Sequence, residues 1–177
     1  MKPFYYAYGN PFSIPVVACR WYPEIAVTEP NEEYAKLLTM DLAFQKSEMT
    51  TMHQYFYQSW TIDCTYQTIR TVIARIAEVE THHFNIIGRL ISLLGGNPTC
   101  SAIQENQTQI WNGTMINYTK DMKELLNDNM EGEKMAAEVY HEQSLELKDP
   151  LVSKMLCRLS FDEQLHHQIF KSFLSQI

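Results

Sequence analysis

Four long segments of the sequence repeat apolar residues at the spacing of an α-helix, and this pattern leaves few folds open to the chain. The segments cover about 31–60, 65–94, 118–147 and 150–177. The second ends at "GGNP" (95–98) and the fourth begins with Asp149-Pro150, which are typical helix stop and start signals. Because two links are short and the connection at 95–116 is long, the sequence predicts an all-α four-helix bundle with one long crossover.

The first 30 residues differ in composition from the rest. They hold five of the seven prolines together with many aromatic residues, so a long helix is excluded there. We expect residues 1–30 to form an extended arm that packs its aromatic side chains on the bundle or on a neighbouring subunit. The remaining residues, 31–177, are expected to form one four-helix domain.

Charge and cysteine content exclude several classes of partner and site. The net charge is −7 and Lys and Arg form no run, which argues against a nucleic acid partner. No apolar stretch of membrane-spanning length occurs, so no membrane partner is expected. The four cysteines form no C-x-x-C pair, which excludes a rubredoxin-type iron site and favours free thiols in a cytoplasmic protein. The N-terminus lacks the continuous apolar core of a signal peptide.

Two glutamate–histidine pairs lie in the second and fourth segments. Glu80 precedes His83 within "EVETHHF" (78–84), and Glu163 precedes His166 within "DEQLHHQIF". On a helix, side chains three residues apart share one face. A carboxylate beside an imidazole is half of a metal site, so two such pairs on facing helices predict a site for two metal ions.

The first and third segments each offer one glutamate with a tyrosine seven residues later. Glu48 precedes Tyr55, and Glu133 precedes Tyr140, so each pair shares a helix face. We expect Glu48 and Glu133 to complete the site as bridging carboxylates. Four buried carboxylates repel one another unless cations compensate them. The two tyrosines are candidate catalytic residues, although ordinary packing explains them equally well.

A third Glu-x-x-His pair, Glu138 and His141, competes with this assignment. Glu138 lies about 140° around the helix from Glu133, and it is too close to the predicted turn at 148–150 to match the level of Glu163. We therefore expect this pair on the outer face. The second histidines of the doublets, His82 and His167, are expected on a helix flank or in solvent.

With these residues assigned, the sequence resembles the ferritin-like superfamily of di-metal carboxylate proteins, most closely bacterioferritin and rubrerythrin-type domains. The resemblance covers about 31–177 and rests on one motif in each segment. The motifs are "SEMTTMHQYFYQS", "EVETHHFNIIGRLISLLGGNP", "DNMEGEKMAAEVY" and "FDEQLHHQIF". It implies the metal ligands Glu48, Glu80, His83, Glu133, Glu163 and His166. It further implies that Glu48 and Glu133 bridge the two ions.

The sequence departs from this pattern at several positions. Thr81 stands where bacterioferritin has its haem-binding Met, so haem is not expected. Too few residues follow His166 for the fifth helix of a storage cage. Rubrerythrin's fused rubredoxin is also absent, so a peroxidase of this type would need an external electron donor.

These observations leave several functions open. The first expectation is a di-iron oxidoreductase that reduces peroxide or dioxygen. The alternatives are a di-manganese catalase, an iron-binding or storage protein, and a metal-free structural bundle. Oxygen and nitrogen ligands of this kind accept both iron and manganese. The aromatic arm and apolar flanks suggest a homodimer or a higher homo-oligomer.

Overall fold

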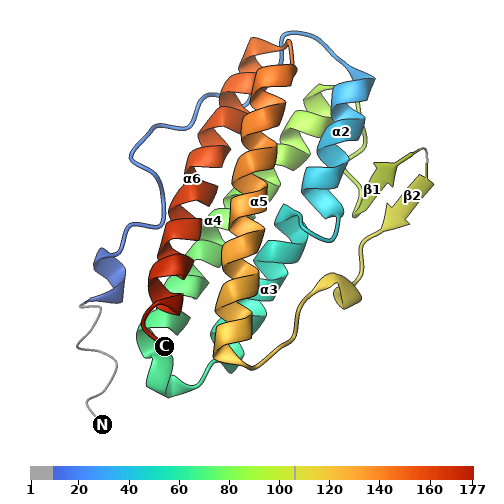
Figure 1. Ribbon diagram of the computed structural model, residues 1–177. Coiled ribbons are helices and arrows are strands. Elements are labelled where there is room, and N and C mark those ends of the chain that lie inside the picture. The colour runs from blue at the N-terminus through green and yellow to red at the C-terminus, as the bar shows by residue number, and fades with distance from the viewer. Residues whose placement is uncertain (1–9, 106) are drawn as a thin grey trace.

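The computed structural model describes residues 10–105 and 107–177, and the predicted arm is therefore described only from residue 10 onward. The chain forms a four-helix bundle with a long crossover, which confirms the predicted fold (Figure 1). Its helices are α2 (Glu32–Ala43), α3 (Glu48–Thr61), α4 (Gln67–Leu93), α5 (Met122–Glu146) and α6 (Pro150–Leu174). Among these described residues, no helix combines the length and apolar character needed to cross a membrane.

The first predicted helix is two helices, which corrects the expectation of one continuous segment. Helix α2 ends before Phe44, whose backbone is extended, and α3 begins after Ser47. The Ser47 side chain accepts a hydrogen bond from the amide of Thr50 and so caps α3. The break makes Glu48 the first residue of α3, where the helix dipole favours a negative charge.

The helix ends follow the sequence signals elsewhere. Gly95 takes the left-handed backbone conformation (φ +89°) just after α4, which an L side chain rarely adopts. Asp149 caps α6 by accepting hydrogen bonds from the amides of Leu151 and Val152, and Pro150 occupies the first helical position. The same Asp149 carboxylate also accepts from Thr28, which ties the arm to this turn.

The crossover contains a small antiparallel sheet that the sequence did not predict. Strand β1 (Ser101–Gln104) pairs with β2 (Gln107–Ile110), and a short 3₁₀ helix follows at Gly113–Met115. The amide of Ile103 donates to the Thr39 hydroxyl (3.0 Å), which holds β1 beside α2. Strands of four residues with mostly polar side chains carry no readable alternation, and this explains the failed prediction.

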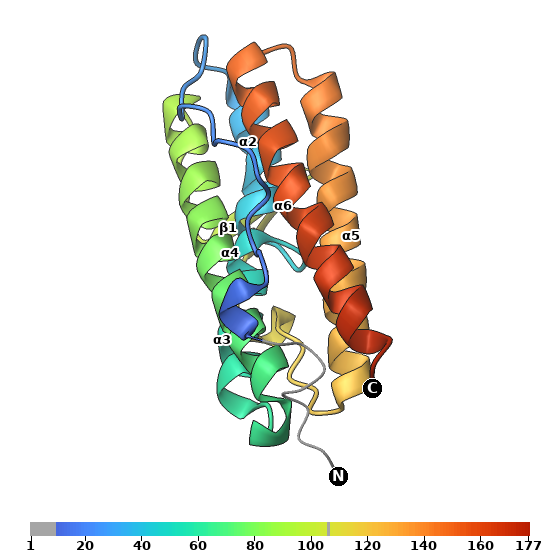
Figure 2. The ribbon, with the colours of Figure 1, turned by 90° about the vertical axis from the view of Figure 1, so that its left-hand side faces the viewer.

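The described part of the arm runs along the bundle beside α4 and α6 (Figure 2). Arg75 on α4 donates to the carbonyls of Pro11 and Ile14 (2.7 Å each), and Arg158 on α6 donates to the carbonyl of Arg20 (2.8 Å). The half-buried Arg75 and the buried Arg158 therefore fasten an otherwise irregular segment to the bundle. All four cysteines are free, as expected.

The core consists of two apolar clusters, one toward each end of the bundle. One cluster includes Leu38, Ile86 and Leu159, and the other includes Ile73 and Phe170. Charged and polar side chains fill the level between the two clusters and are almost fully buried. The fold therefore encloses a polar layer between two dry, well-packed regions, and the candidate site lies in that layer.

Candidate metal centre

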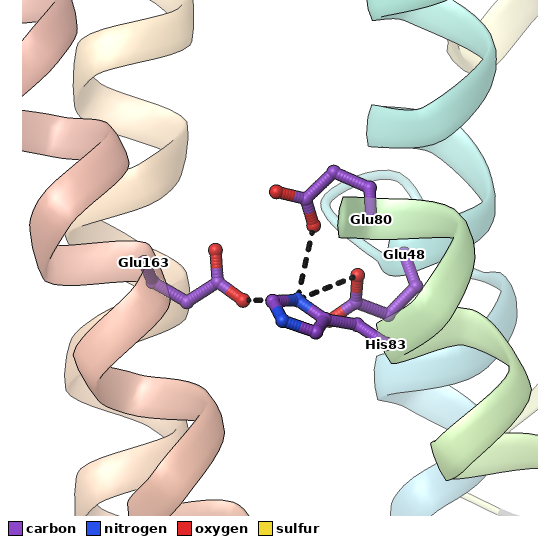
Figure 3. A group of neighbouring side chains, drawn as sticks. All are labelled: Glu48, Glu80, His83 and Glu163. Carbon is purple, nitrogen blue, oxygen red and sulfur yellow. Dashed lines mark ion pairs between the residues drawn. The ribbon is translucent and has the colours of Figure 1, made fainter. Parts of the chain in front are cut away.

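The structure brings together all six side chains that the sequence singled out as ligands. Glu48 comes from α3, Glu80 and His83 from α4, Glu133 from α5, and Glu163 and His166 from α6. None of them exposes more than 4% of its surface. Figure 3 shows four of them, with Glu163 approaching His83 from the opposite side of the bundle to Glu48 and Glu80.

The six residues form two overlapping groups, each compact enough to hold one ion. One group is Glu48, Glu80, His83 and Glu163, and the other is Glu80, Glu133, Glu163 and His166. Glu80 and Glu163 belong to both groups, whereas Glu48 and Glu133 each belong to one. The predicted bridging role of Glu48 and Glu133 is therefore wrong. Glu80 and Glu163, each on the same helix face as a histidine, are the carboxylates that the two groups share.

The distances around the two histidines follow the same pattern. His83 Nδ1 lies 2.9 Å from Glu163 Oε1, 3.4 Å from Glu80 Oε2 and 3.8 Å from Glu48 Oε2. His166 Nδ1 lies 2.8 Å from Glu80 Oε1, 3.5 Å from Glu163 Oε2 and 3.6 Å from Glu133 Oε2. Each shared glutamate thus directs one oxygen toward each histidine.

The inward-facing atoms approach one another without forming hydrogen bonds. His83 Nδ1, His166 Nδ1 and one carboxylate oxygen each of Glu48, Glu80 and Glu163 are buried and have no hydrogen-bond partner. Orphaned buried polar atoms are costly, and several orphans facing a common point are explained by a cation between them. Four carboxylates also balance the charge of two divalent ions. The residues present therefore fit a di-metal centre.

The electrostatics agree with this interpretation. Burial raises the pKa of Glu48 and Glu133 well above the ordinary range, and the charge of Glu80 adds to the shift. Burial opposes the charged forms of His83 and His166, but the neighbouring carboxylates outweigh it and raise both pKa values. Metal ions would therefore compete with protons for these groups.

Both candidate catalytic tyrosines hydrogen-bond the unshared glutamates, and they do so across the bundle. The Tyr55 hydroxyl donates to Glu133 Oε1 (2.5 Å), and the Tyr140 hydroxyl donates to Glu48 Oε1. One oxygen of each glutamate is thereby fixed, and the other oxygen faces the cluster. The sequence paired each tyrosine with the glutamate on its own helix, whereas the structure pairs it with the glutamate of the other half.

The outer nitrogens of the histidines have partners that sequence reasoning missed. His83 Nε2 donates to Asp162 Oδ2 (3.1 Å), whereas His166 Nε2 donates to the backbone carbonyl of Val16 (2.8 Å). Both contacts leave the Nδ1 lone pair directed inward, as a metal ligand requires. Asp162 directly precedes Glu163, but no sequence spacing connects it with His83 on another helix. Val16 acts through its backbone, which no side-chain motif can reveal.

Asp162 is itself held by three groups. Arg158 Nη1 lies 2.8 Å from Asp162 Oδ2, the Ala18 amide donates to Oδ1 (2.6 Å), and the Tyr22 hydroxyl donates to Oδ2. Burial raises the pKa of Asp162, but His83 and the hydrogen bonds from Tyr22 and the Ala18 amide outweigh it and lower the pKa to about 2. Asp162 therefore stays ionised and holds His83 in place.

The competing residues lie away from the cluster, as predicted. Glu138 exposes 63% of its side chain and approaches Lys134, and His141 is exposed. His82 packs its ring edge-on against Tyr22 near the surface, and His167 Nδ1 donates to the carbonyl of Met130 (3.0 Å). Neither the third Glu-x-x-His pair nor the second histidines of the doublets contribute to the centre.

A cavity of about 420 Å³ leads to the cluster from the break between α2 and α3. All four glutamates of the cluster line it, but neither histidine does. Its remaining walls are mainly apolar side chains, among them Met40 of α2, Phe44 of the break and Val139 of α5. A small molecule can therefore reach the carboxylate side of the cluster, while the arm covers the histidine side.

Comparison with known proteins identifies the family. A sequence profile described as manganese containing catalase matches residues 22–118, more than half of the 177-residue chain. The chain belongs to the manganese containing catalase family. The matched segment includes Glu48, Glu80 and His83, so it covers one half of the cluster. The ligand candidates on α5 and α6 lie beyond it and rest on the sequence pattern and the geometry.

Solved structures of the family share the fold. Wild-type KatB, a manganese catalase from Anabaena, and KatB from Anabaena PCC7120 each superpose with a TM-score of 0.78 and are 22% identical in sequence. Each alignment covers 89% of this chain and 78% of the other. No curated protein sequence matches the chain.

Family membership refines the functional expectations from the sequence. It supports a di-metal oxidoreductase of the ferritin-like superfamily, as the resemblance implied. It supports the alternative of two manganese ions and catalase chemistry better than the first expectation of two iron ions and a rubrerythrin-like peroxidase.

Proposed function

We propose that this protein is a di-manganese catalase, which converts two molecules of hydrogen peroxide into two of water and one of dioxygen. The observation that carries the proposal is the pair of overlapping ligand groups at the end of a cavity. The family assignment supports manganese as the metal. Peroxide is both the oxidant and the reductant in this reaction, so no external electron donor is needed.

When bound, two manganese ions would together accept two electrons from the peroxide that is oxidised and donate two electrons to the peroxide that is reduced. The residues proposed to hold them are Glu48, Glu80, His83, Glu133, Glu163 and His166. Glu80 and Glu163, which belong to both ligand groups, would serve both ions. Glu48 and Glu133 would each serve one ion, and each is oriented by the hydrogen bond it accepts from a tyrosine hydroxyl.

The two faces of the centre have different tasks. The cavity admits peroxide to the carboxylate face, where its apolar walls restrict the amount of water that accompanies it. On the other face, Asp162 and the Val16 carbonyl hold the imidazoles in one orientation and one tautomer. These contacts would keep both Nδ1 atoms directed at the ions.

The test compares metal content with oxygen release. Protein purified without chelator is analysed for manganese and iron, then loaded with each metal separately and mixed with peroxide. We expect about two manganese ions per chain and oxygen release at half the rate of peroxide loss. Glu133→Gln should abolish the reaction. Glu138→Gln removes an exposed carboxylate from the same helix and should leave the reaction unchanged.

The outcomes separate the remaining functions. Two irons and peroxide consumption that requires an added reductant would replace the catalase with a di-iron peroxidase. Bound metal without turnover would favour an iron-binding or storage role. Failure to bind either metal after reconstitution would leave only a structural bundle.

A further inference from the structure

The cavity contains a second acidic group that the metal centre does not use. Asp41 on α2 and Gln143 on α5 are both buried and both line the cavity wall. Gln143 Nε2 donates to Asp41 Oδ1 (3.2 Å), which joins α2 and α5 at the cavity wall. Asp41 belongs to neither ligand group of the metal centre. It lies on a separate helix, seven residues before Glu48.

This pair has two acceptor atoms without a donor. Asp41 Oδ2 and Gln143 Oε1 are buried, and neither has a hydrogen-bond partner. The nearby cation on the cavity wall, Lys46, is ion-paired to Asp128 instead (2.9 Å). A proton on Asp41 would turn one of the two orphaned acceptors into a donor, so the geometry favours a carboxyl group that can hold a proton.

We propose that Asp41, paired with Gln143, is the proton carrier of the cavity, taking a proton from one peroxide and returning it to the next. This inference rests on the proposed catalase function. When one peroxide is oxidised to dioxygen, it loses two electrons and two protons. When the second is reduced, its O–O bond breaks and two electrons and two protons complete two waters. Asp41 carries one of these protons, and the solvent of the cavity carries the other.

The surroundings of Asp41 suit this task. The other titratable groups on the cavity wall are Lys46, Tyr140 and the four glutamates of the cluster. Burial raises the pKa of Asp41 to about 7, although the hydrogen bond from Gln143 opposes the shift. A carrier works best when its pKa lies near the operating pH, because it must both accept and release the proton.

Asp41 also has a route to the cluster. Its charge contributes to the raised pKa of Tyr140, after burial and the nearer charge of Glu48. The Tyr140 hydroxyl donates to Glu48, so Asp41 and the cluster are coupled through one side chain on the same cavity wall. Asp41 thus lines the same cavity as the four glutamates of the cluster but belongs to neither ligand group.

The experiment measures the proton on Asp41 and its effect on turnover. In protein labelled with ¹³C at the aspartate carboxyl groups, infrared spectroscopy separates a protonated aspartate from the buried glutamates. We expect one protonated aspartate band that disappears between about pH 6 and pH 8. Asp41→Asn should remove this band, keep two manganese ions per chain and slow oxygen release at least tenfold. Glu138→Gln serves as the control and should change neither measurement.

Two results would overturn the inference while the catalase function stands. One is a wild-type spectrum in which every aspartate is ionised at pH 6, which needs no variant to fold. The other is a fully loaded Asp41→Asn enzyme with wild-type turnover and an unchanged pH profile. If manganese-loaded wild-type protein releases no oxygen, both the proposed function and the role of Asp41 fail together.

Discussion

The two halves of the cluster present the same groups to the centre but differ in what supports those groups from outside. Each half has one unshared glutamate, one shared glutamate and one histidine with Nδ1 inward. Behind His83 stands the charged carboxylate of Asp162, with Arg158 and Tyr22 around it. Behind His166 stands the neutral backbone carbonyl of Val16.

This difference predicts two unequal metal positions. A carboxylate that accepts the outer N–H makes an imidazole a more basic ligand than a backbone carbonyl does. The ion beside His83 should therefore bind more tightly than the ion beside His166. The six ligand candidates follow a repeat in the sequence. The outer partners of the histidines do not: Val16 belongs to the arm, and Asp162 lies outside the repeat. The asymmetry thus arises from the parts of the chain that do not repeat.

The largest effect is expected from the shared glutamates, which belong to both halves. Glu163→Gln removes a negative charge from both ligand groups and should reduce the manganese content from about two per chain to almost none. Glu48→Gln affects one group and should leave about one ion. Metal analysis after dialysis distinguishes the two results. Equal loss in both variants would mean that Glu163 is not shared.

Acidification should weaken metal binding at both halves. The neighbouring carboxylates raise the pKa of His83 and His166 in the metal-free cluster, so protons compete with metal ions for their Nδ1 atoms. The affinity for the pair of ions should therefore fall as the pH is lowered, at least about tenfold for each pH unit where one such proton is displaced. Calorimetry in buffers of different ionisation enthalpy counts the released protons. Binding that is independent of pH would contradict these protonation states.

A third prediction tests the asymmetry directly. Asp162→Asn should weaken the tighter metal position about 10- to 100-fold, because His83 loses its charged partner. The weaker position should change little, so the two binding steps should converge. Val16→Ala keeps the backbone carbonyl and should preserve both steps, which makes it the matched control. If Asp162→Asn weakened both positions equally, the outer partners would not be the source of the difference.

The sequence predicted which inner side chains the fold brings together, because their spacing follows helix periodicity. Glu80 and His83 share a face by spacing alone, and the same holds for Glu163 and His166. The sharing of carboxylates was predicted incorrectly, because it depends on how the helices approach one another rather than on spacing within a helix. The break before Glu48 was also missed, although Ser47 is a good N-cap followed by an acidic residue.

The outer groups could not be read from the sequence at all. The contact between Asp162 and His83 joins residues 79 positions apart, and the contact between Val16 and His166 joins residues 150 apart. No local pattern encodes either contact. No sequence motif distinguishes Asp41 from other polar residues of its helix. The structure places it on the cavity wall beside Gln143.

The smallest effect on metal affinity is expected from the two tyrosines, and it tests whether the two metal positions behave independently. Tyr55→Phe and Tyr140→Phe each remove one hydroxyl that donates to an unshared glutamate of the opposite half. A single hydrogen bond contributes about 1 kcal/mol net, so each change should weaken one metal position about fivefold. Because Tyr140 supports Glu48 beside His83, its loss should affect the tighter step, whereas the loss of Tyr55 should affect the weaker one. A double variant should show both effects, added together, since the two hydroxyls contact different glutamates. If both single variants weakened the same step, the halves would be coupled more strongly than their separate ligands imply.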